Sequence, residues 1–429
     1  MSMRPAHREP VKADRFGEPV AAADAATVAV WDASFGQLID FLGDPVGSLA
    51  AVNAVDDAFV LGPVLCAAAR VLGGWSPTHP LVVTDVRRVD ARAATPRERG
   101  HREALALLVS GEFGRAAARW DQVAAVHRRD LLAIRLAHDL YLHNGDADGR
   151  FRSSEAAIRN WQRGERGYAA VAGQLAFAYE ELGRFTDAER WARQALDAEP
   201  GDPWARHALM HVFESEGRHD EALELLHDTR GDWRQRTLFA NHLWWHFALR
   251  MLANGEPGPA FDVLDHQLGT GSAFDLCDAT SLVWWMELAG LDVANRWLPL
   301  ARRWAPVRER HHSAFVDVHA AMAFAAAARV APDDIAPDDV EAARFWDGLA
   351  ASHLPVVSEN DVTFATVVKP LAASLRVYCA GDRRAAVAEM RALLPRLHRI
   401  GGSVIQRSII AATISASDAD FVQQEGDPT

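Results

Sequence analysis

The chain has 429 residues, of which 49% are hydrophobic, and a formal net charge of −13. This composition supports a large core, and the acidic balance is opposite to the basic surface of nucleic-acid-binding proteins. The charged first residues and the short apolar run 59–69, which contains Pro63, predict neither a secretory leader nor a membrane span.

Three cysteines, Cys66, Cys277 and Cys379, lie far apart in the sequence. This spacing predicts neither disulfides nor a thiolate metal site, and we expect a cytoplasmic protein. Lysine is scarce whereas alanine and arginine are abundant, a bias that indicates a bacterial genome rich in G and C.

Helical patterning covers most of the chain, which we divide into three parts. Residues 1–24 are expected to form a disordered arm, residues 25–416 a single domain of helical hairpins, and residues 417–429 an acidic, frayed tail. Within the domain we predict, in order, helices in 25–95, a first hairpin in 96–145, an irregular insertion in 146–166, three consecutive hairpins in 167–270, further helices in 275–330, a polar turn in 331–340 and a last helical pair in 341–416.

A short signature marks the hairpins. A turn glycine is followed five positions later by alanine at Gly111/Ala116, Gly183/Ala188, Gly217/Ala222, Gly255/Ala260 and Gly381/Ala386. The interval from Gly183 to Gly217 is 34 residues, which is the period of tetratricopeptide repeats, helix–turn–helix units. The pattern predicts an all-α fold, a right-handed α-solenoid of tetratricopeptide-like helical hairpins.

Two consecutive hairpins carry histidine pairs with helical spacing. Residues 204–214 read WARHALMHVFE, and residues 239–249 read FANHLWWHFAL. Residues four apart share one face of a helix, so each segment presents two imidazoles on one side. These rings belong to His207 and His211 in the first segment and to His242 and His246 in the second.

The position of the histidines relative to the turn glycines predicts which way they face. At about 100° per residue, His207, His211, Glu214, His242 and His101 fall on the side of the first helix that lines the concave surface of such arrays, where ligands bind. His246 falls beside that face. We therefore expect the four imidazoles and the Glu214 carboxylate to face a common space.

Several segments resemble the tetratricopeptide repeat protein 38 family, over most of residues 28–416. They read TPRERGH (95–101), LAIRLAHDLYLHNG (132–145), HALMHVFE (207–214), NHLWWHFAL (241–249), DVHAAMA (317–323) and GGSVIQR (401–407). The positions that match the polar residues of that family are His138, Asp139, His207, His211, His242, Trp245, His246, Asp317, His319, Gln406 and Arg407. The resemblance implies a helical-repeat fold and carries over no activity.

The spacing and the resemblance together give the candidate residues. The candidate catalytic residues are His138, Asp139, His207, His211, Glu214, His242, His246, Asp317 and His319. The candidate binding residues are His101, Trp245, Asp278, Gln406 and Arg407. A carboxylate such as Asp139, Asp278 or Asp317 would orient a histidine of another helix and make its second ring nitrogen a better base.

Three kinds of site remain open. In the first, neutral imidazoles and a carboxylate hold Zn²⁺, Fe²⁺ or Mn²⁺. The candidate ligands are His207, His211, His246 (or His242 in its place) and Glu214, which is either a ligand or a general base acting on bound water. In the second, an aspartate-oriented histidine acts as a base without a metal. In the third, the groove binds a peptide, with a tryptophan such as Trp245 stacking on the ligand.

Other catalytic motifs are absent from the sequence. Ala208 follows His207, so the HExxH pattern of zinc proteases does not occur there. There is no P-loop, GxGxxG or GxSxG, so we expect no nucleotide cofactor.

We favour an enzyme, a hydrolase or lyase that acts on a small molecule by histidine acid–base chemistry, with a divalent metal such as zinc or iron as the candidate cofactor. The alternative is a non-catalytic tetratricopeptide scaffold that binds a peptide or partner protein in its groove. We expect no nucleic-acid or membrane partner, and the sequence leaves the oligomeric state open.

Overall fold

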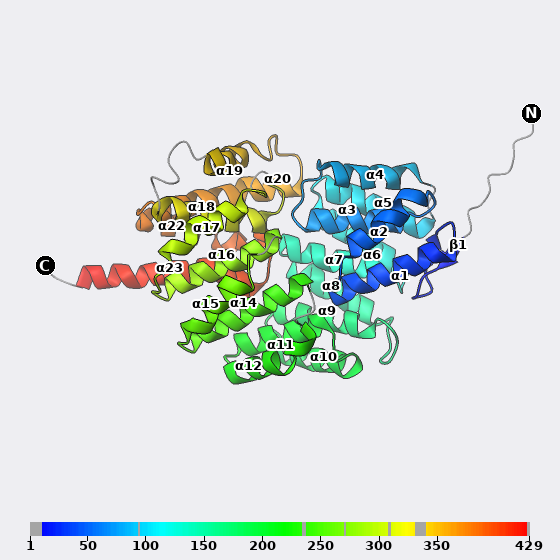
Figure 1. Cartoon of the computed structure of the whole chain (residues 1–429), viewed down its shortest axis with the longest axis horizontal. Helices are drawn as coiled ribbons and strands as arrows, with labels where there is room; N and C mark the ends of the chain where they lie inside the picture. The colour runs from blue at the N-terminus through cyan, green and yellow to red at the C-terminus, as the bar shows by residue number, and fades with distance from the viewer. Residues whose placement is uncertain are drawn as a thin grey trace, which may run out of the picture.

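The computed structural model describes residues 11–92, 95–233, 237–269, 272–307, 310–330 and 340–426. These residues form an all-α helical-repeat solenoid, preceded by two short strands (Figure 1). The first elements are β1 (Val11–Ala13), β2 (Pro19–Ala21), α1 (Ala25–Asp40), α2 (Pro45–Val55), α3 (Leu61–Leu72) and α4 (Pro80–Ala91).

The middle of the chain consists of successive helical hairpins. They are built from α5 (Pro96–Val109), α6 (Phe113–Val126), α7 (Leu131–Asn144), α8 (Ala147–Ile158), α9 (Tyr168–Glu181), α10 (Phe185–Ala198), α11 (Pro203–Ser215), α12 (His219–Asp228), α13 (Arg230–Trp233), α14 (Thr237–Ala253) and α15 (Pro257–His266). The third part consists of α16 (Ala273–Leu288), α17 (Ala294–Trp304), α18 (Ala314–Val330), α19 (Val340–Ala351), α20 (Glu359–Thr363), η1 (Phe364–Val368), α21 (Lys369–Cys379), α22 (Arg383–Leu393), η2 (Leu394–Ile400) and α23 (Val404–Gly426).

The glycine–alanine signature has the structural role that its spacing predicts. All five glycines lie between the two helices of a hairpin and have φ between 69° and 106°, a conformation that costs glycine little. The alanine of each signature is buried, with an exposed fraction of 1% or less. A larger side chain at these alanines would push the two helices of the hairpin apart.

Local sequence signals fix where the helices that carry the histidines begin. Asp202 caps α11, its carboxylate accepting a hydrogen bond from the Ala205 N–H at 2.8 Å, and Pro203 occupies the first turn, where no backbone donor is needed. Ser272 caps α16 in the same way, accepting from the N–H of Asp275 at 3.1 Å. These caps set the register of the helices around the candidate site.

The array curls until its C-terminal part reaches its N-terminal part (Figure 1). The Gly114 N–H donates to Glu359 of α20 at 2.6 Å, and the Asn360 N–H donates to the carbonyl of Gly111 at 3.0 Å. At the other C-terminal contact, the N–H of Val404, at the start of α23, donates to Glu181 of α9 at 2.9 Å. The concave side of the array is therefore covered by its own C-terminal elements.

The first twenty-four residues differ from the predicted disordered arm. Residues 1–10 lie outside the described residues, but β1 and β2 form an antiparallel hairpin. It docks on α5 through a buried ion pair at 2.9 Å between Asp14 and Arg97 and through the Ala21 N–H, which donates to Glu98 at 2.9 Å. These long-range contacts order a segment whose own composition is too polar to form a hydrophobic core.

Two further segments also differ from expectation. Residues 146–166, predicted as an irregular insertion, contain α8, which Asp146 caps by accepting from the Gly149 N–H at 2.7 Å. Helix α23 continues to Gly426, through most of the predicted frayed tail at 417–429. The predicted polar turn at 331–340 lies almost wholly outside the described residues.

One continuous helical segment, Glu359–Cys379, is long and apolar enough to cross a membrane by length and composition. Half of its most apolar window is buried inside the molecule. Phe364, Val367 and Leu371 are each 0% exposed, so this segment packs as a core helix of the array.

Candidate functional site

Two neighbouring helices bring four imidazoles together, as the spacing predicts. Helix α11 supplies His207 and His211, and α14 supplies His242 and His246. One ring nitrogen from each lies within 4.8 Å of the corresponding nitrogens of the other three. The Nε2 atom of His242 is 3.1 Å from Nε2 of His207 and 3.2 Å from Nε2 of His246. We call these four residues the four-histidine cluster.

The four-histidine cluster is buried, whereas the sequence predicted that these residues line a concave pocket. His207 is 5% exposed, and His211 and His246 are 0% exposed. Only the side chain of His242 reaches solvent, with 15% exposure, and its ring stacks on the buried Trp245 at a centroid distance of 5.2 Å. The rings of Phe177 and Phe239 lie 4.9 and 5.3 Å from the ring of His207, and Phe41, which follows α1, stacks on Phe239.

Three rings of the cluster each have a carboxylate at Nδ1. The pairs are His211 with Glu180 at 3.1 Å, His242 with Asp278 at 3.0 Å and His246 with Glu214 at 2.9 Å. Where the carboxylate is ionised, it can only accept a hydrogen bond, so Nδ1 of the ring carries the hydrogen and Nε2 keeps a free lone pair. Glu214 is further fixed by Arg250, whose Nε lies 3.0 Å from its second oxygen.

Burial keeps three rings of the cluster neutral. It lowers the pKa of His207 and His246 well below the usual value of 6.5 and that of His211 to about 4. Burial also raises the pKa of Glu180 to about 8, against the nearby charge of Arg150. At neutral pH Glu180 is therefore protonated and His211 is neutral, so the Glu180–His211 pair carries no net charge.

The comparisons with known proteins identify the repeat. A tetratricopeptide repeat family model matches residues 169–212. The chain is a tetratricopeptide-repeat protein. The matched repeat spans α9, α10 and most of α11, so it includes His207, His211 and Glu180. No solved structure matches the chain.

The tetratricopeptide array does not bring His101 to the four-histidine cluster, although the same spacing predicts the same face. His101 is 0% exposed, and both of its ring nitrogens are engaged. Nε2 lies 2.8 Å from a carboxylate oxygen of Asp130, and Nδ1 accepts from the indole N–H of Trp120 at 3.0 Å. Its repeat lies at the other end of the array, where it packs beside Arg97.

His138 and Asp139 also lie apart from the shared space. His138 is 1% exposed, and Nε of Arg150 donates to its Nε2 at 2.8 Å. Asp139 pairs with Arg135 on the same helix at 2.8 Å. The side chain of Asp139 thus pairs with an arginine of its own helix, where the sequence suggested that it would orient a histidine of another helix.

Three candidate residues from the C-terminal part of the chain, Gln406, Arg407 and His319, bond to the backbone of nearby residues. Arg407 bonds the Gly402 carbonyl and lies 3.6 Å from Glu181, which places it behind Glu180. Gln406 accepts from the Ser403 N–H at 2.9 Å. Nδ1 of His319 lies 2.8 Å from the carbonyl of Phe315 and donates to it.

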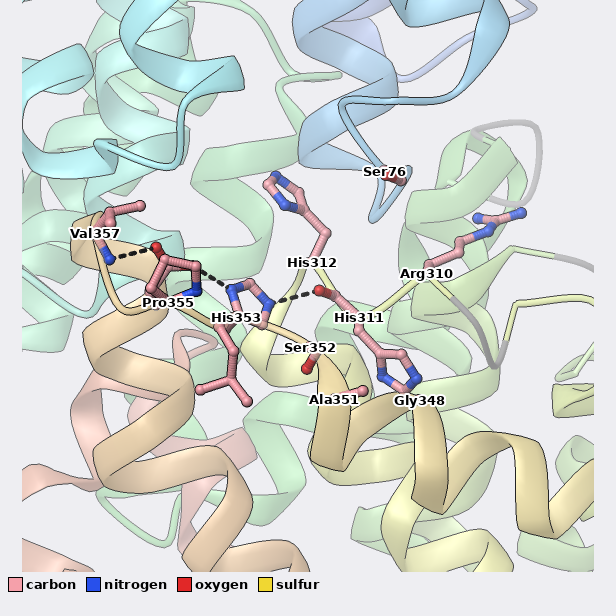
Figure 2. A pocket seen from close by; sticks show the side chains of 12 residues that line it. Ser76, Arg310, His311, His312, Gly348, Ala351, Ser352, His353, Pro355 and Val357 are labelled. Atoms are coloured by element: carbon pink, nitrogen blue, oxygen red, sulfur yellow. Dashed lines mark hydrogen bonds and ion pairs between the residues drawn. The ribbon is translucent and has the colours of Figure 1, made fainter.

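Asp317 belongs to a second site, which the sequence did not predict. Nδ1 of His311 lies 2.6 Å from Asp317. His311 lines a cavity of about 600 Å³, together with Arg310, His312, His353 and Asp361 (Figure 2). We call this space the His311 cavity. The adjacent histidines His311 and His312 were the signal that could have marked it.

Proposed function

We propose that the four-histidine cluster binds one divalent transition-metal ion through the Nε2 atoms of its four rings. One observation carries the proposal. His242 and His246 face each other with Nε2 atoms 3.2 Å apart, although each has a carboxylate at Nδ1. Two lone pairs then point at one another without a hydrogen between them, and a cation in that space would satisfy both.

The donor set favours a metal of intermediate softness. Imidazole nitrogens suit zinc, iron, copper and nickel better than magnesium or calcium, which prefer oxygen ligands. In this arrangement His242 takes the place that the sequence assigned to Glu214. Glu214 instead acts through His246, as carboxylates commonly do behind a metal-bound histidine.

We further propose that the bound ion serves a hydrolase or lyase reaction on a small molecule. His242 is the ligand nearest to solvent, with a side chain 15% exposed, so exchange of this ring for water or substrate is the least costly way to open a coordination position. Once displaced, the ring would remain oriented by Asp278 and could act as a general base. A peptide-binding groove would instead need exposed side chains, which the three buried rings do not provide.

Two broader proposals accompany this one. The first is membership of the tetratricopeptide repeat protein 38 family, which is supported by the residues between His138 and Arg407 that match the polar positions of that family. A cytoplasmic location is supported by the three cysteines, which are all free and buried.

Metal titration of the chelator-treated full chain tests the metal site. We expect one Zn²⁺ per chain, and His242→Ala should weaken binding by more than the roughly 100-fold loss of an outer partner. His227→Ala is the matched control, because that side chain is 84% exposed and lies outside the cluster. No bound metal in the wild type, or equal binding by both variants, would remove the proposal.

The catalytic part has a separate test. Metal-loaded and chelated protein would be compared on a panel of small amides and esters and on substrates for elimination. Turnover that requires the metal and is lost in His242→Ala would support the reaction class. Stoichiometric metal binding without turnover would leave a structural metal site in a tetratricopeptide scaffold.

A further inference from the structure

The wall of the His311 cavity is held by a chain of hydrogen bonds. Nε2 of His353 donates to the carbonyl of His311 at 2.7 Å, and its Nδ1 lies 2.6 Å from Asp361 (Figure 2). The Asn360 side chain donates to the carbonyl of His312 at 3.0 Å. Both ring nitrogens of His353 are therefore engaged, one by the carboxylate of Asp361 and the other by a backbone carbonyl.

Backbone strain is concentrated in the same wall. His311 has φ of 36° and His353 has φ of 57°, conformations that cost a non-glycine residue on the order of 1 kcal/mol or more. Two of the three such residues in the described part of the chain thus line one cavity. Strained residues fixed by several hydrogen bonds are typical of binding and catalytic sites.

The cavity lining also contains a cation, Arg310, that has no anionic partner among the described residues. Arg310 stacks over the ring of Trp75 at 5.2 Å from its centroid. Among the described residues no carboxylate lies within ion-pair distance of its guanidinium. The one acidic residue of the cavity lining, Asp361, is fully engaged: its second oxygen accepts from the N–H groups of Val357 and Ser358 at 3.0 and 2.8 Å.

Burial lowers the pKa of Arg310, which reflects a guanidinium that has lost water and gained no counter-charge. Hydrogen bonds from the N–H groups of Val357 and Ser358 and from His353 hold the pKa of Asp361 at about 2 despite its partial burial. Asp361 thus stays ionised, and its two oxygens are taken up by His353, Val357 and Ser358. Among the described residues, no carboxylate is left to pair with Arg310.

The opposite side of the cavity is apolar. Leu354, Pro355 and Val357 line it, and Leu354 and Val357 are 66% and 76% exposed. A ligand that filled the space would cover these side chains and gain apolar burial. The lining therefore combines one end that attracts an anion with another that favours hydrocarbon.

We propose that the His311 cavity binds a small organic acid, whose carboxylate pairs with Arg310 and whose apolar body covers Leu354, Pro355 and Val357. A planar guanidinium held against an aromatic ring suits bidentate pairing with a carboxylate. The site is separate from the four-histidine cluster and needs no metal.

Calorimetric titration of the full chain, treated with chelator, tests this site with hexanoate, acetate, inorganic phosphate and chloride at equal ionic strength. We expect hexanoate to bind most tightly, with an affinity gain of up to about fourfold for each methylene beyond acetate. Arg310→Gln should weaken hexanoate binding by about 10-fold or more. Arg302→Gln is the matched control, since Arg302 is exposed and lies outside the cavity lining.

Each outcome decides the proposal. Hexanoate binding that is reduced in Arg310→Gln and unchanged in Arg302→Gln supports it, provided that both variants keep the circular dichroism and melting temperature of the wild type. If Arg310→Gln does not fold, the wild type is titrated with hexanol, which is neutral. Hexanol binding as tight as that of hexanoate overturns the proposal. Absence of hexanoate binding, or phosphate binding at least as tight, overturns it as well.

Discussion

Replacing Asp278 with asparagine tests whether the carboxylates around the four-histidine cluster tune a bound metal. Asp278 lies 3.0 Å from Nδ1 of His242. Asparagine keeps the shape and an acceptor oxygen but removes the charge, so the ring donates to a weaker partner. Loss of such an outer partner lowers metal affinity about 10- to 100-fold, or about 1.4 to 2.7 kcal/mol. Because His242 is partly exposed to water, we expect the lower end, about 10-fold.

Competition with a coloured chelator gives the Zn²⁺ dissociation constants of the wild type and of Asp278→Asn. The matched control is Glu18→Gln, which removes the charge from another histidine–carboxylate pair, Glu18 and His127, whose atoms lie 2.9 Å apart. The control should leave the zinc affinity unchanged. An unchanged affinity in Asp278→Asn, or an equal loss in both variants, would refute the outer-partner role of Asp278.

Three other outcomes follow from the geometry. His246→Ala should destabilise even the metal-free protein by about 1–3 kcal/mol in urea unfolding, because buried Glu214 loses the hydrogen bond from His246 and keeps only Arg250. A loss under about 0.5 kcal/mol would contradict this. Burial, with the charges of nearby histidines, lowers the pKa of His312 in the folded protein to about 3. In the unfolded chain the same imidazole has a pKa of about 6.5, so on acidification the unfolded chain binds a proton at a higher pH than the folded protein does. The free energy of unfolding should therefore fall by up to about 5 kcal/mol between pH 6.5 and 3. His312→Gln should make the free energy of unfolding less dependent on pH over this range, and the same slope in the variant would contradict the assignment. In Gly348→Ala, the new Cβ would lie 2.6 Å from Nε2 of His311, so the imidazole should move and its NMR signals shift, at a cost of about 1–3 kcal/mol; unchanged signals would show that the backbone yields instead.

The repeat architecture could be predicted because its determinants are local. A turn glycine and an alanine five positions later describe one hairpin, and Gly183 with Ala188 has the φ and the burial that the pattern requires. The hairpin of β1 and β2 could not be predicted in this way. Its order depends on Asp14 meeting Arg97, 83 positions later, and no periodicity in the sequence connects them.

The same distinction applies to the four-histidine cluster. Each histidine pair shares a helix face through its spacing of four, and consecutive repeats stack, so the convergence followed from the sequence. The partners at Nδ1 were only partly foreseen. Asp278 was a candidate for orienting a histidine, whereas Glu180 was not, because its contact with His211 spans 31 positions and depends on how α9 packs against α11.

The burial of the cluster could not be predicted from repeat spacing. Spacing places side chains on the concave face, but the curvature of the array decides what lies opposite. Here α20 reaches Gly111 and Gly114, and the start of α23 reaches Glu181. These contacts join segments more than 200 positions apart, so the repeat spacing does not reveal them.

Histidine–carboxylate pairs are common in this chain, so a pair alone does not mark a site. Asp130 and Trp120 engage both ring nitrogens of His101, so this ring has no nitrogen left for a ligand. In His242 and His246 the carboxylates engage only Nδ1, and the remaining Nε2 atoms face each other. A neutral buried ring gains nothing from that approach unless a proton or a cation lies between. Because burial disfavours the additional proton, a cation is the partner that the geometry of this cluster best accommodates.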